Sequence, residues 1–307
     1  MEDEAAERRR GLAFGTAAYF MWGMFPLYFP LLRPAGTVEI LASRMAWSLV
    51  VVIVLLQFGS GFRGVRAVLR DRRRFGTLTA AAVLISVNWG VYIYGVNSGH
   101  VVETSLGYFI NPLFTIILGV VVLGERLRPA QWVAVGIGVV AVLVIAIDYG
   151  RPPWIALILA FSFGLYGFAK KQVGVGATDS LAIETGVLFV PAVVALIVVA
   201  AQGDLVFGTR LPTSLLLAGS GLVTAVPLIF FAAGASRLPL SIMGLLQYLT
   251  PSLQFAVGVG IRHESTPAAE LAGFVLVWIA LAVLSVDGLR HQRRRGSRMA
   301  EVEPVPG

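Results

Sequence analysis

An arginine stands within a long apolar stretch of this sequence, where its charge calls for a partner. Arg44 follows Glu39 by five residues, and the flanking segment is otherwise rich in Leu, Val and Ile. At the depth of a membrane core an unpaired arginine costs at least ~2.5–3.5 kcal/mol. We therefore expect Arg44 to meet either a substrate carboxylate or phosphate, or an internal partner: Glu39, Glu184 or Glu103. The two are compatible, because an ion pair can open to admit a ligand.

A second set of polar and aromatic side chains recurs at helical spacing within apolar runs. Residues three or four apart share one helix face, as Asn88 and Tyr92 do, and likewise Tyr108 and Asn111. The last two members of the set stand at the matching position of a repeated segment late in the chain. The set comprises Asn88, Trp89, Tyr92, Tyr108, Asn111, Gln247 and Tyr248. Together with Arg44 they predict a substrate-binding pocket of amides and aromatic faces near the membrane midplane, suited to an uncharged or zwitterionic organic molecule. For the aromatic residues, helix packing or an interfacial belt is the alternative.

Carboxylates within or beside the apolar runs are candidates for ion coupling or for structural ion pairs. Burial raises a carboxyl pKa toward neutrality, so Glu184 in the I-E-T-G segment could bind and release a proton. A structural pair with Lys170, Lys171 or Arg44 is the simpler interpretation. Glu39 and Glu103 are open to the same two interpretations.

An intramembrane enzyme is the main alternative class, and the motifs that it would need are missing from the sequence. The three histidines, His100, His263 and His291, are scattered, whereas a zinc site needs clustered ligands. No D-D-x-x-D, G-x-S-x-G or Walker motif occurs. We therefore expect no catalytic residues, no metal and no cofactor. A non-transporting membrane scaffold and a channel are further alternatives.

Long helices must position these side chains, because the chain is 57% hydrophobic and only 13% charged. One helix needs about 20 apolar residues to cross a bilayer. The runs predict an all-α integral membrane protein with ten spans, approximately 11–32, 38–57, 77–97, 102–123, 130–147, 153–169, 182–201, 212–234, 240–260 and 267–286. The lipid bilayer is thus one expected partner.

The distribution of basic residues predicts the orientation. With the N-terminus in the cytoplasm and ten alternating spans, 19 of the 24 Lys and Arg residues lie in cytoplasmic segments and four on the opposite face. Cytoplasmic loops of membrane proteins carry this excess. Both termini are therefore expected in the cytoplasm, and residues 291–307 form a basic tail. The net charge of +7 thus reflects topology, and no nucleic-acid partner is expected.

The chain also repeats one of its segments. Residues 108–125 read YFINPLFTIILGVVVLGE, and residues 247–264 read QYLTPSLQFAVGVGIRHE. At one fixed offset Pro112 meets Pro251, Gly119 meets Gly258, and Glu125 meets Glu264. The match predicts two halves, 1–150 and 151–290, of five helices each. An odd number of helices per half places the second half upside down, as in many secondary transporters. The repeated glutamates are expected to cap loops or anchor gates.

The proline-containing helix that ends in Gly-Glu before another proline resembles the EamA repeat of the drug/metabolite transporter superfamily. Segments 39–48 (EILASRMAWS), 88–113 (NWGVYIYGVNSGHVVETSLGYFINPL) and 237–255 (RLPLSIMGLLQYLTPSLQF) resemble the RarD branch of it. In the second repeat His263-Glu264 replaces the usual Gly-Glu. The resemblance implies a ten-helix permease of the bacterial inner membrane that moves a small metabolite or drug-like molecule by alternating access. RarD proteins are linked by name to chloramphenicol sensitivity, and the family does not define a substrate. A homo-oligomer is compatible with the small-residue helix faces.

Overall fold

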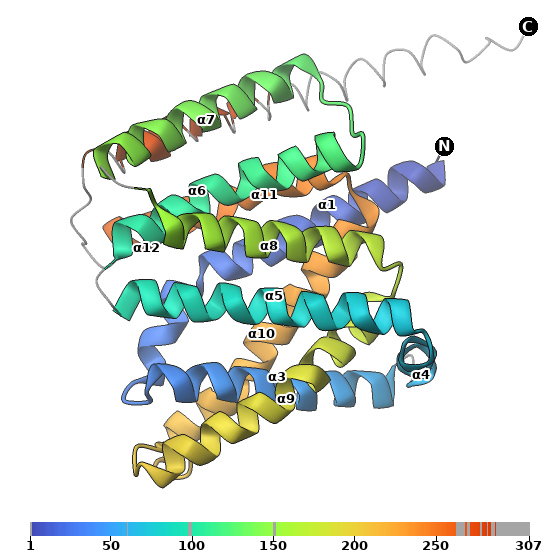
Figure 1. Ribbon diagram of the computed structural model, residues 1–307, viewed down its shortest axis with the longest axis vertical. Helices are drawn as coiled ribbons and strands as arrows, with labels where there is room; N and C mark the ends of the chain where they lie inside the picture. Colours follow the sequence, from blue (N-terminus) through green and yellow to red (C-terminus); the bar gives the residue numbers. More distant parts are fainter. Residues whose placement is uncertain are drawn as a thin grey trace, which may run out of the picture. The chain divides into compact units, whose positions relative to one another are not determined.

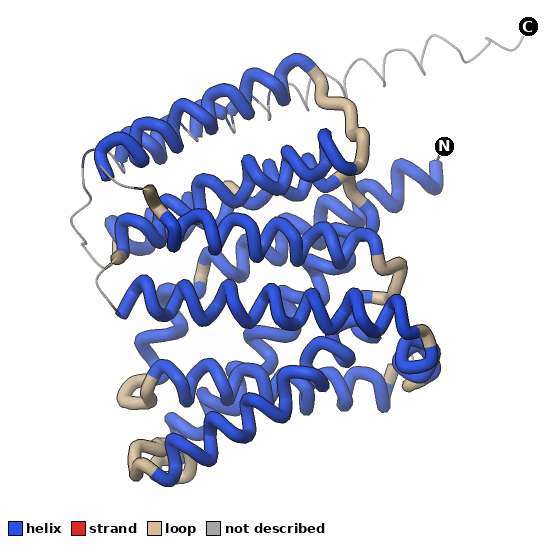
Figure 2. Tube along the Cα trace, viewed as in Figure 1, coloured by secondary structure: helices blue, strands red, loops and turns tan. Residues whose placement is uncertain are grey.

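The computed structural model describes residues 2–59, 61–97, 100–149 and 152–261, and isolated helical positions between 268 and 286. These residues form helices joined by short loops and turns (Figure 2). The chain divides into two compact units. The larger contains Met1–Glu125 and Pro153–Ser265, and the smaller contains Arg126–Pro152 and Thr266–Gly307.

The larger unit holds nearly all of the described helices. They are α1 (Glu2–Gly23), α2 (Phe25–Tyr28), the 3-10 turn η1 (Phe29–Leu32), α3 (Thr37–Phe58), α4 (Arg63–Arg70), α5 (Arg72–Asn97), α6 (Val101–Ile117), the π-helical η2 (Leu118–Val122), α8 (Trp154–Gln172), α9 (Ala177–Ala201), α10 (Leu211–Arg237), α11 (Leu240–Gln247) and α12 (Leu249–Gly260). Helices therefore occupy the predicted positions of the spans from 38–57 to 240–260 that fall in this unit. The short basic α4 lies between two of them.

Six segments are long and apolar enough to cross a membrane by length and composition. They are Thr37–Phe58, Arg72–Gly95, Trp154–Gln172, Ala177–Ala201, Leu211–Arg237 and Leu240–Val257. Shorter apolar helices include Leu106–Val122 and Pro129–Val144. The protein is thus all-helical in its described part and has the composition of a multi-pass membrane protein. The count of ten spans and the inverted arrangement of two halves stay predictions.

Prolines interrupt two of the predicted spans. The first, predicted over 11–32, is broken at Met24, after which Pro26 and Pro30 each occupy the second position of a short helical turn. Near the end of the unit the helix is interrupted at Tyr248. Pro251 has no N–H to donate to the carbonyl four residues earlier, so an unbroken α-helix cannot keep all its hydrogen bonds there.

The long helices of the larger unit pack against one another. In Figure 1, α8 lies between α5 and α6, and α3 crosses α9. Helix α10 packs on both α1 and α3. Gly221 permits the contact with α3, because a Cβ at this position would overlap the backbone carbonyl of Trp47. The two backbones therefore approach more closely than side chains would allow.

The first repeated segment packs against the helix that leads into the second. Helix α6 carries Pro112 and packs on α11, which precedes Pro251. A Cβ on Gly244 would lie 2.8 Å from the carbonyl oxygen of Pro112. Glu125 closes this contact, since its two carboxylate oxygens accept the backbone N–H groups of Leu240 (2.7 Å) and Ser241 (2.8 Å). Glu125 thus caps the start of α11, while its expected role as a gate anchor stays a prediction.

The smaller unit is described mainly by α7 (Pro129–Tyr149). The backbone N–H of Arg128 donates to the side-chain oxygen of Gln131 at 2.8 Å, which closes the first turn. Glu264 and the predicted tail, 291–307, lie outside the described residues.

Candidate substrate-binding site

Arg44 lies in the first half of α3 and faces the interior of the larger unit. Its side chain is 9% exposed. The Nε atom donates a hydrogen bond to Oγ1 of Thr224 on α10, at 2.9 Å. Thr224 lies one turn after Gly221, so the close helix contact there brings the two side chains within reach.

Three aromatic rings surround the guanidinium. Its central carbon lies 4.8 Å from the ring centroid of Trp89 on α5, 5.2 Å from that of Phe29 and 5.4 Å from that of Phe25. Each ring presents electron density that attracts a cation. The proline-punctuated segment after α1 supplies both phenylalanines, whose own rings pack edge to face at 5.2 Å.

Three tyrosines complete the surroundings of Arg44. Tyr28, Tyr92 and Tyr108 all lie near the guanidinium. The rings of Tyr92 and Tyr108 pack edge to face, with centroids 5.9 Å apart. The Tyr28 hydroxyl donates to the carbonyl of Leu216 at 2.6 Å. Residues of α3, α5, α6, α10 and the segment after α1 therefore meet at one place.

The expected internal ion pair of Arg44 does not form within the part of the chain that the structure describes, because each candidate carboxylate accepts other donors. Glu39 accepts the backbone N–H of Phe207 at 2.7 Å and that of Val206 at 3.1 Å. Glu103 accepts the backbone N–H of Ile155 at 2.6 Å. Glu184 pairs with a lysine. The first two carboxylates therefore tie neighbouring chain segments to their own helices.

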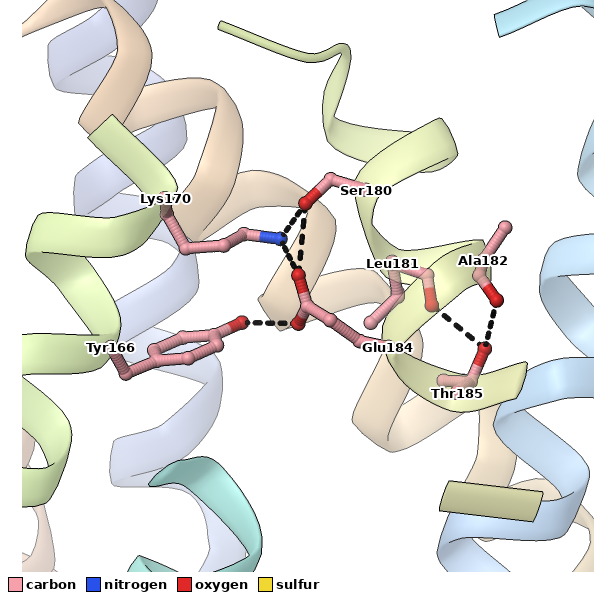
Figure 3. Close-up of polar contacts among 7 residues, drawn as sticks. All are labelled: Tyr166, Lys170, Ser180, Leu181, Ala182, Glu184 and Thr185. Carbon is pink, nitrogen blue, oxygen red and sulfur yellow. Dashed lines mark hydrogen bonds and ion pairs between the residues drawn. The ribbon is translucent and has the colours of Figure 1, made fainter. Parts of the chain in front are cut away.

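Glu184 belongs to a buried ion pair between α8 and α9 (Figure 3). Its Oε1 lies 2.5 Å from Nζ of Lys170, and the two side chains are 2% and 1% exposed. The Tyr166 hydroxyl donates to Oε2 at 3.1 Å, and Ser180 contacts both members of the pair. Every carboxylate oxygen and the ammonium thus have partners, which a buried pair requires. The structure agrees with the structural interpretation of Glu184, while a role in ion coupling stays a prediction.

A small cavity of about 10 Å³, which has room for about one water molecule, adjoins both features. Trp89 and Thr224 of the Arg44 site and Glu184 of the ion pair line it. Aliphatic side chains make up much of the remaining wall: Met45, Ile85, Leu181, Leu188 and Leu228. The cavity therefore continues the Arg44 site into an apolar space.

Four of the eight predicted binding residues gather at this site, namely Arg44, Trp89, Tyr92 and Tyr108. Asn88 instead donates to the Leu159 carbonyl (2.9 Å) and to the Ser162 hydroxyl (3.0 Å) on α8.

The remaining three lie in the region of the repeated segments. With its amide nitrogen toward α8, Asn111 donates to the Ala160 carbonyl (2.9 Å) and accepts from Gln247 (3.3 Å). Tyr248 is 1% exposed, and its hydroxyl has no partner within the described part of the chain. Asn111 and Gln247 thus join α6 to α11.

Sequence reasoning missed Phe25, Phe29 and Thr224. The spacing Phe25-Pro26-x-x-Phe29-Pro30 is an available signal, because two prolines in one predicted span break the helix and redirect the rings. A single threonine in an apolar run gives no comparable signal. Such a residue commonly bonds to its own helix, as Thr224 also does to the carbonyl of Ser220 at 2.7 Å.

Comparison with known proteins identifies the class of protein to which the chain belongs. Residues 9–147 match the model of the EamA-like transporter family. The chain is 54% identical to Protein RarD of Streptomyces exfoliatus over 300 residues, which is 97% of this chain and 95% of that protein. It is 40% identical to a protein of Pseudomonas aeruginosa named an uncharacterized transporter, over 94% of this chain and 97% of that one. The chain belongs to the RarD-type permeases of the EamA family.

A solved structure supports the fold alone. A crystal structure matches with a TM-score of 0.69 and 16% sequence identity, covering 90% of this chain and 97% of the other. The family and the apolar helices together define a multi-pass membrane permease of the drug/metabolite transporter type.

Proposed function

We propose that this protein is a secondary transporter that carries a small organic molecule across the bacterial inner membrane, and that Arg44 holds an anionic group of that molecule. The observation that carries the proposal is the buried guanidinium with aromatic rings around it and no carboxylate partner among the described residues. Intramembrane charges of this kind mark substrate or ion pathways.

The energetics favour a ligand-binding role over a purely structural one. Desolvation of the guanidinium is offset by one hydrogen bond, from Nε to Thr224, and by the aromatic faces. Within the described part of the chain, the hydrogen-bond donors on the two terminal nitrogens remain available for an anion. A bundle that needed only packing at this position would be served better by an aliphatic side chain.

Alternating access supplies a route to the buried site. At 9% exposure Arg44 is reached only when the surrounding helices separate. The helix breaks at Met24 and Tyr248 and the π-helical turn at Leu118–Val122 are suitable places for such movement. We place the site between two inverted halves, 1–150 and 151–290, and both termini in the cytoplasm, as the distribution of basic residues favours.

Counterflow in proteoliposomes tests the transport function even while the substrate is unidentified. Vesicles containing the purified protein are loaded with unlabelled bacterial metabolite extract and diluted into extract labelled uniformly with ¹³C. Mass spectrometry then identifies compounds whose label accumulates inside. We expect one compound, or a chemically related group, to accumulate saturably above protein-free vesicles.

The same experiment separates the competing classes. Flux that rises without saturation would indicate a channel. No accumulation of any compound above protein-free vesicles, with correctly folded and inserted protein, would contradict transport of a soluble metabolite and favour a non-transporting scaffold.

A further inference from the structure

We infer that the Arg44 site selects a small monocarboxylate with an aromatic or otherwise apolar body over phosphate esters, dicarboxylates and zwitterions. This inference rests on the proposed function, because it names the substrate class of the same site. Three features carry it: a planar fork of donors that fits a carboxylate, the net charge and the apolar surroundings.

The donors available at the site match one carboxylate. Nε of Arg44 is already bonded to Thr224, which leaves the two terminal nitrogens as a planar fork. Such a fork makes two parallel hydrogen bonds to a carboxylate. The neighbouring hydroxyl protons are committed: Thr224 and Ser48 donate to carbonyls one turn earlier in their own helices, and Tyr28 donates to a carbonyl of α10. Tyr92 and Tyr108 are hydrogen-bonded to each other, so this pair retains one proton to donate.

A phosphate ester would leave negative charge uncompensated at this site. It presents three terminal oxygens and close to two negative charges at neutral pH. The guanidinium of Arg44 neutralises one of these charges, and a second charge buried without a partner is costly.

The net charge of the site is that of one cation. Glu184, which lines the adjoining cavity, is neutralised by Lys170 at 2.5 Å. Arg44 therefore contributes one uncompensated positive charge among the described residues that line the site and the cavity. A single negative charge neutralises it, whereas a dianion would leave one charge buried without a partner.

A zwitterion is disfavoured because its ammonium group would also be buried without a partner of opposite charge. Its ammonium group would need a carboxylate beside Arg44, and Glu39 and Glu103 accept backbone amides elsewhere while Glu184 holds Lys170.

The surroundings favour an apolar body on the carboxylate. The rings of Phe25, Phe29 and Trp89 border the guanidinium, and the adjoining cavity is walled largely by aliphatic side chains. Aromatic rings pack well on such a surface.

Ligand-induced stabilisation of the purified protein tests the selectivity. The probes are benzoate, its neutral isostere benzamide, the dianions phthalate and phenyl phosphate, the zwitterion phenylalanine and the aliphatic hexanoate. A ligand that binds the folded state raises its unfolding temperature by mass action. We expect saturable stabilisation by benzoate or hexanoate. Benzamide, which lacks the charge, should bind ~100-fold more weakly, the loss that accompanies two charge-assisted hydrogen bonds.

Variants of one residue locate the binding. Arg44→Gln should abolish the benzoate effect, and Arg44→Lys, which keeps the charge but not the fork, should weaken binding about tenfold. Arg66→Gln, on the exposed face of α4, serves as the matched control and should bind as the wild type does.

Two results would overturn the inference. One is stronger Arg44-dependent stabilisation by phenyl phosphate, phthalate or phenylalanine than by the monocarboxylates. The other is the absence of any effect from both monocarboxylates up to their solubility limits. In either case saturable counterflow of another compound would leave the transport function standing, whereas failure of counterflow itself would remove the proposed function.

Discussion

The ion pair between Lys170 and Glu184 predicts a specific pattern of stability in variants. The two side chains are 1% and 2% exposed, and their charged atoms are 2.5 Å apart. Removing one member of a buried pair leaves an uncompensated charge and costs ~3–5 kcal/mol, whereas replacing both members is often nearly neutral. We therefore expect Glu184→Gln and Lys170→Met to be strongly destabilising alone, and the double variant to return close to the wild type.

The double-mutant cycle is measured by thermal unfolding in one detergent. Each single replacement should lower the unfolding temperature by roughly 6–20 °C, from the free energies above. Lys171→Met is the matched control. The side chain of Lys171 is 25% exposed, and its ammonium donates to the carbonyl of Leu238. The loss of stability should therefore be much smaller. The ion pair would be refuted if the double variant were as unstable as the worse single variant. It would also be refuted if the single variants unfolded at the wild-type temperature.

Three further predictions concern a cap, a helix contact and a surface ion pair. Glu125→Ala removes the acceptor of the first two amides of α11 and should cost ~1–2 kcal/mol, with a smaller loss for Glu125→Gln, which keeps one acceptor; thermal unfolding of both checks this, and equal losses would contradict it. Gly221→Ala should cost ~1–3 kcal/mol, because the new methyl group would overlap the backbone of α3; wild-type stability would refute the contact. Hydrogen bonds from Arg10 and then Arg237 lower the pKa of Glu7 below its ordinary value of 4.5, so its stabilising effect is complete above that pH and is lost as pH falls through the lowered pKa. The unfolding temperature of the wild type minus that of Glu7→Gln, measured against pH, should fall in that acidic range, and a flat difference would contradict it.

The sequence predicts the helices well because one requirement dominates their composition. A segment within a bilayer must be apolar over about 20 residues and must satisfy its own backbone hydrogen bonds. The segments around 38–57 and 212–234 are accordingly helical. Helix breaks are harder to predict. Pro112 lies within a continuous α6, whereas the segment containing Pro26 and Pro30 leaves the first helix altogether.

Only part of the site can be predicted from the sequence, because its partners come from helices far apart in the chain. The cost of a buried charge identifies Arg44 from the sequence alone. Which carboxylates are already occupied depends on tertiary contacts: Glu39 reaches backbone amides 167 and 168 residues later in the chain. The amides Asn111 and Gln247 have the residue types of a binding pocket, and in the structure they bond to each other between two helices. Residue type therefore indicates the need for a partner, and the fold decides which partner meets it.

The kinetics of counterflow in Arg44→Gln test the central claim most directly. The compound that the wild type accumulates is measured over a range of concentrations in vesicles containing equal amounts of wild type, Arg44→Gln and Arg66→Gln. The proposed site predicts that Arg44→Gln loses saturable counterflow while Arg66→Gln retains wild-type KM and maximal rate. Unchanged kinetics in Arg44→Gln, with protein that is folded and inserted, would contradict the claim that Arg44 holds the substrate.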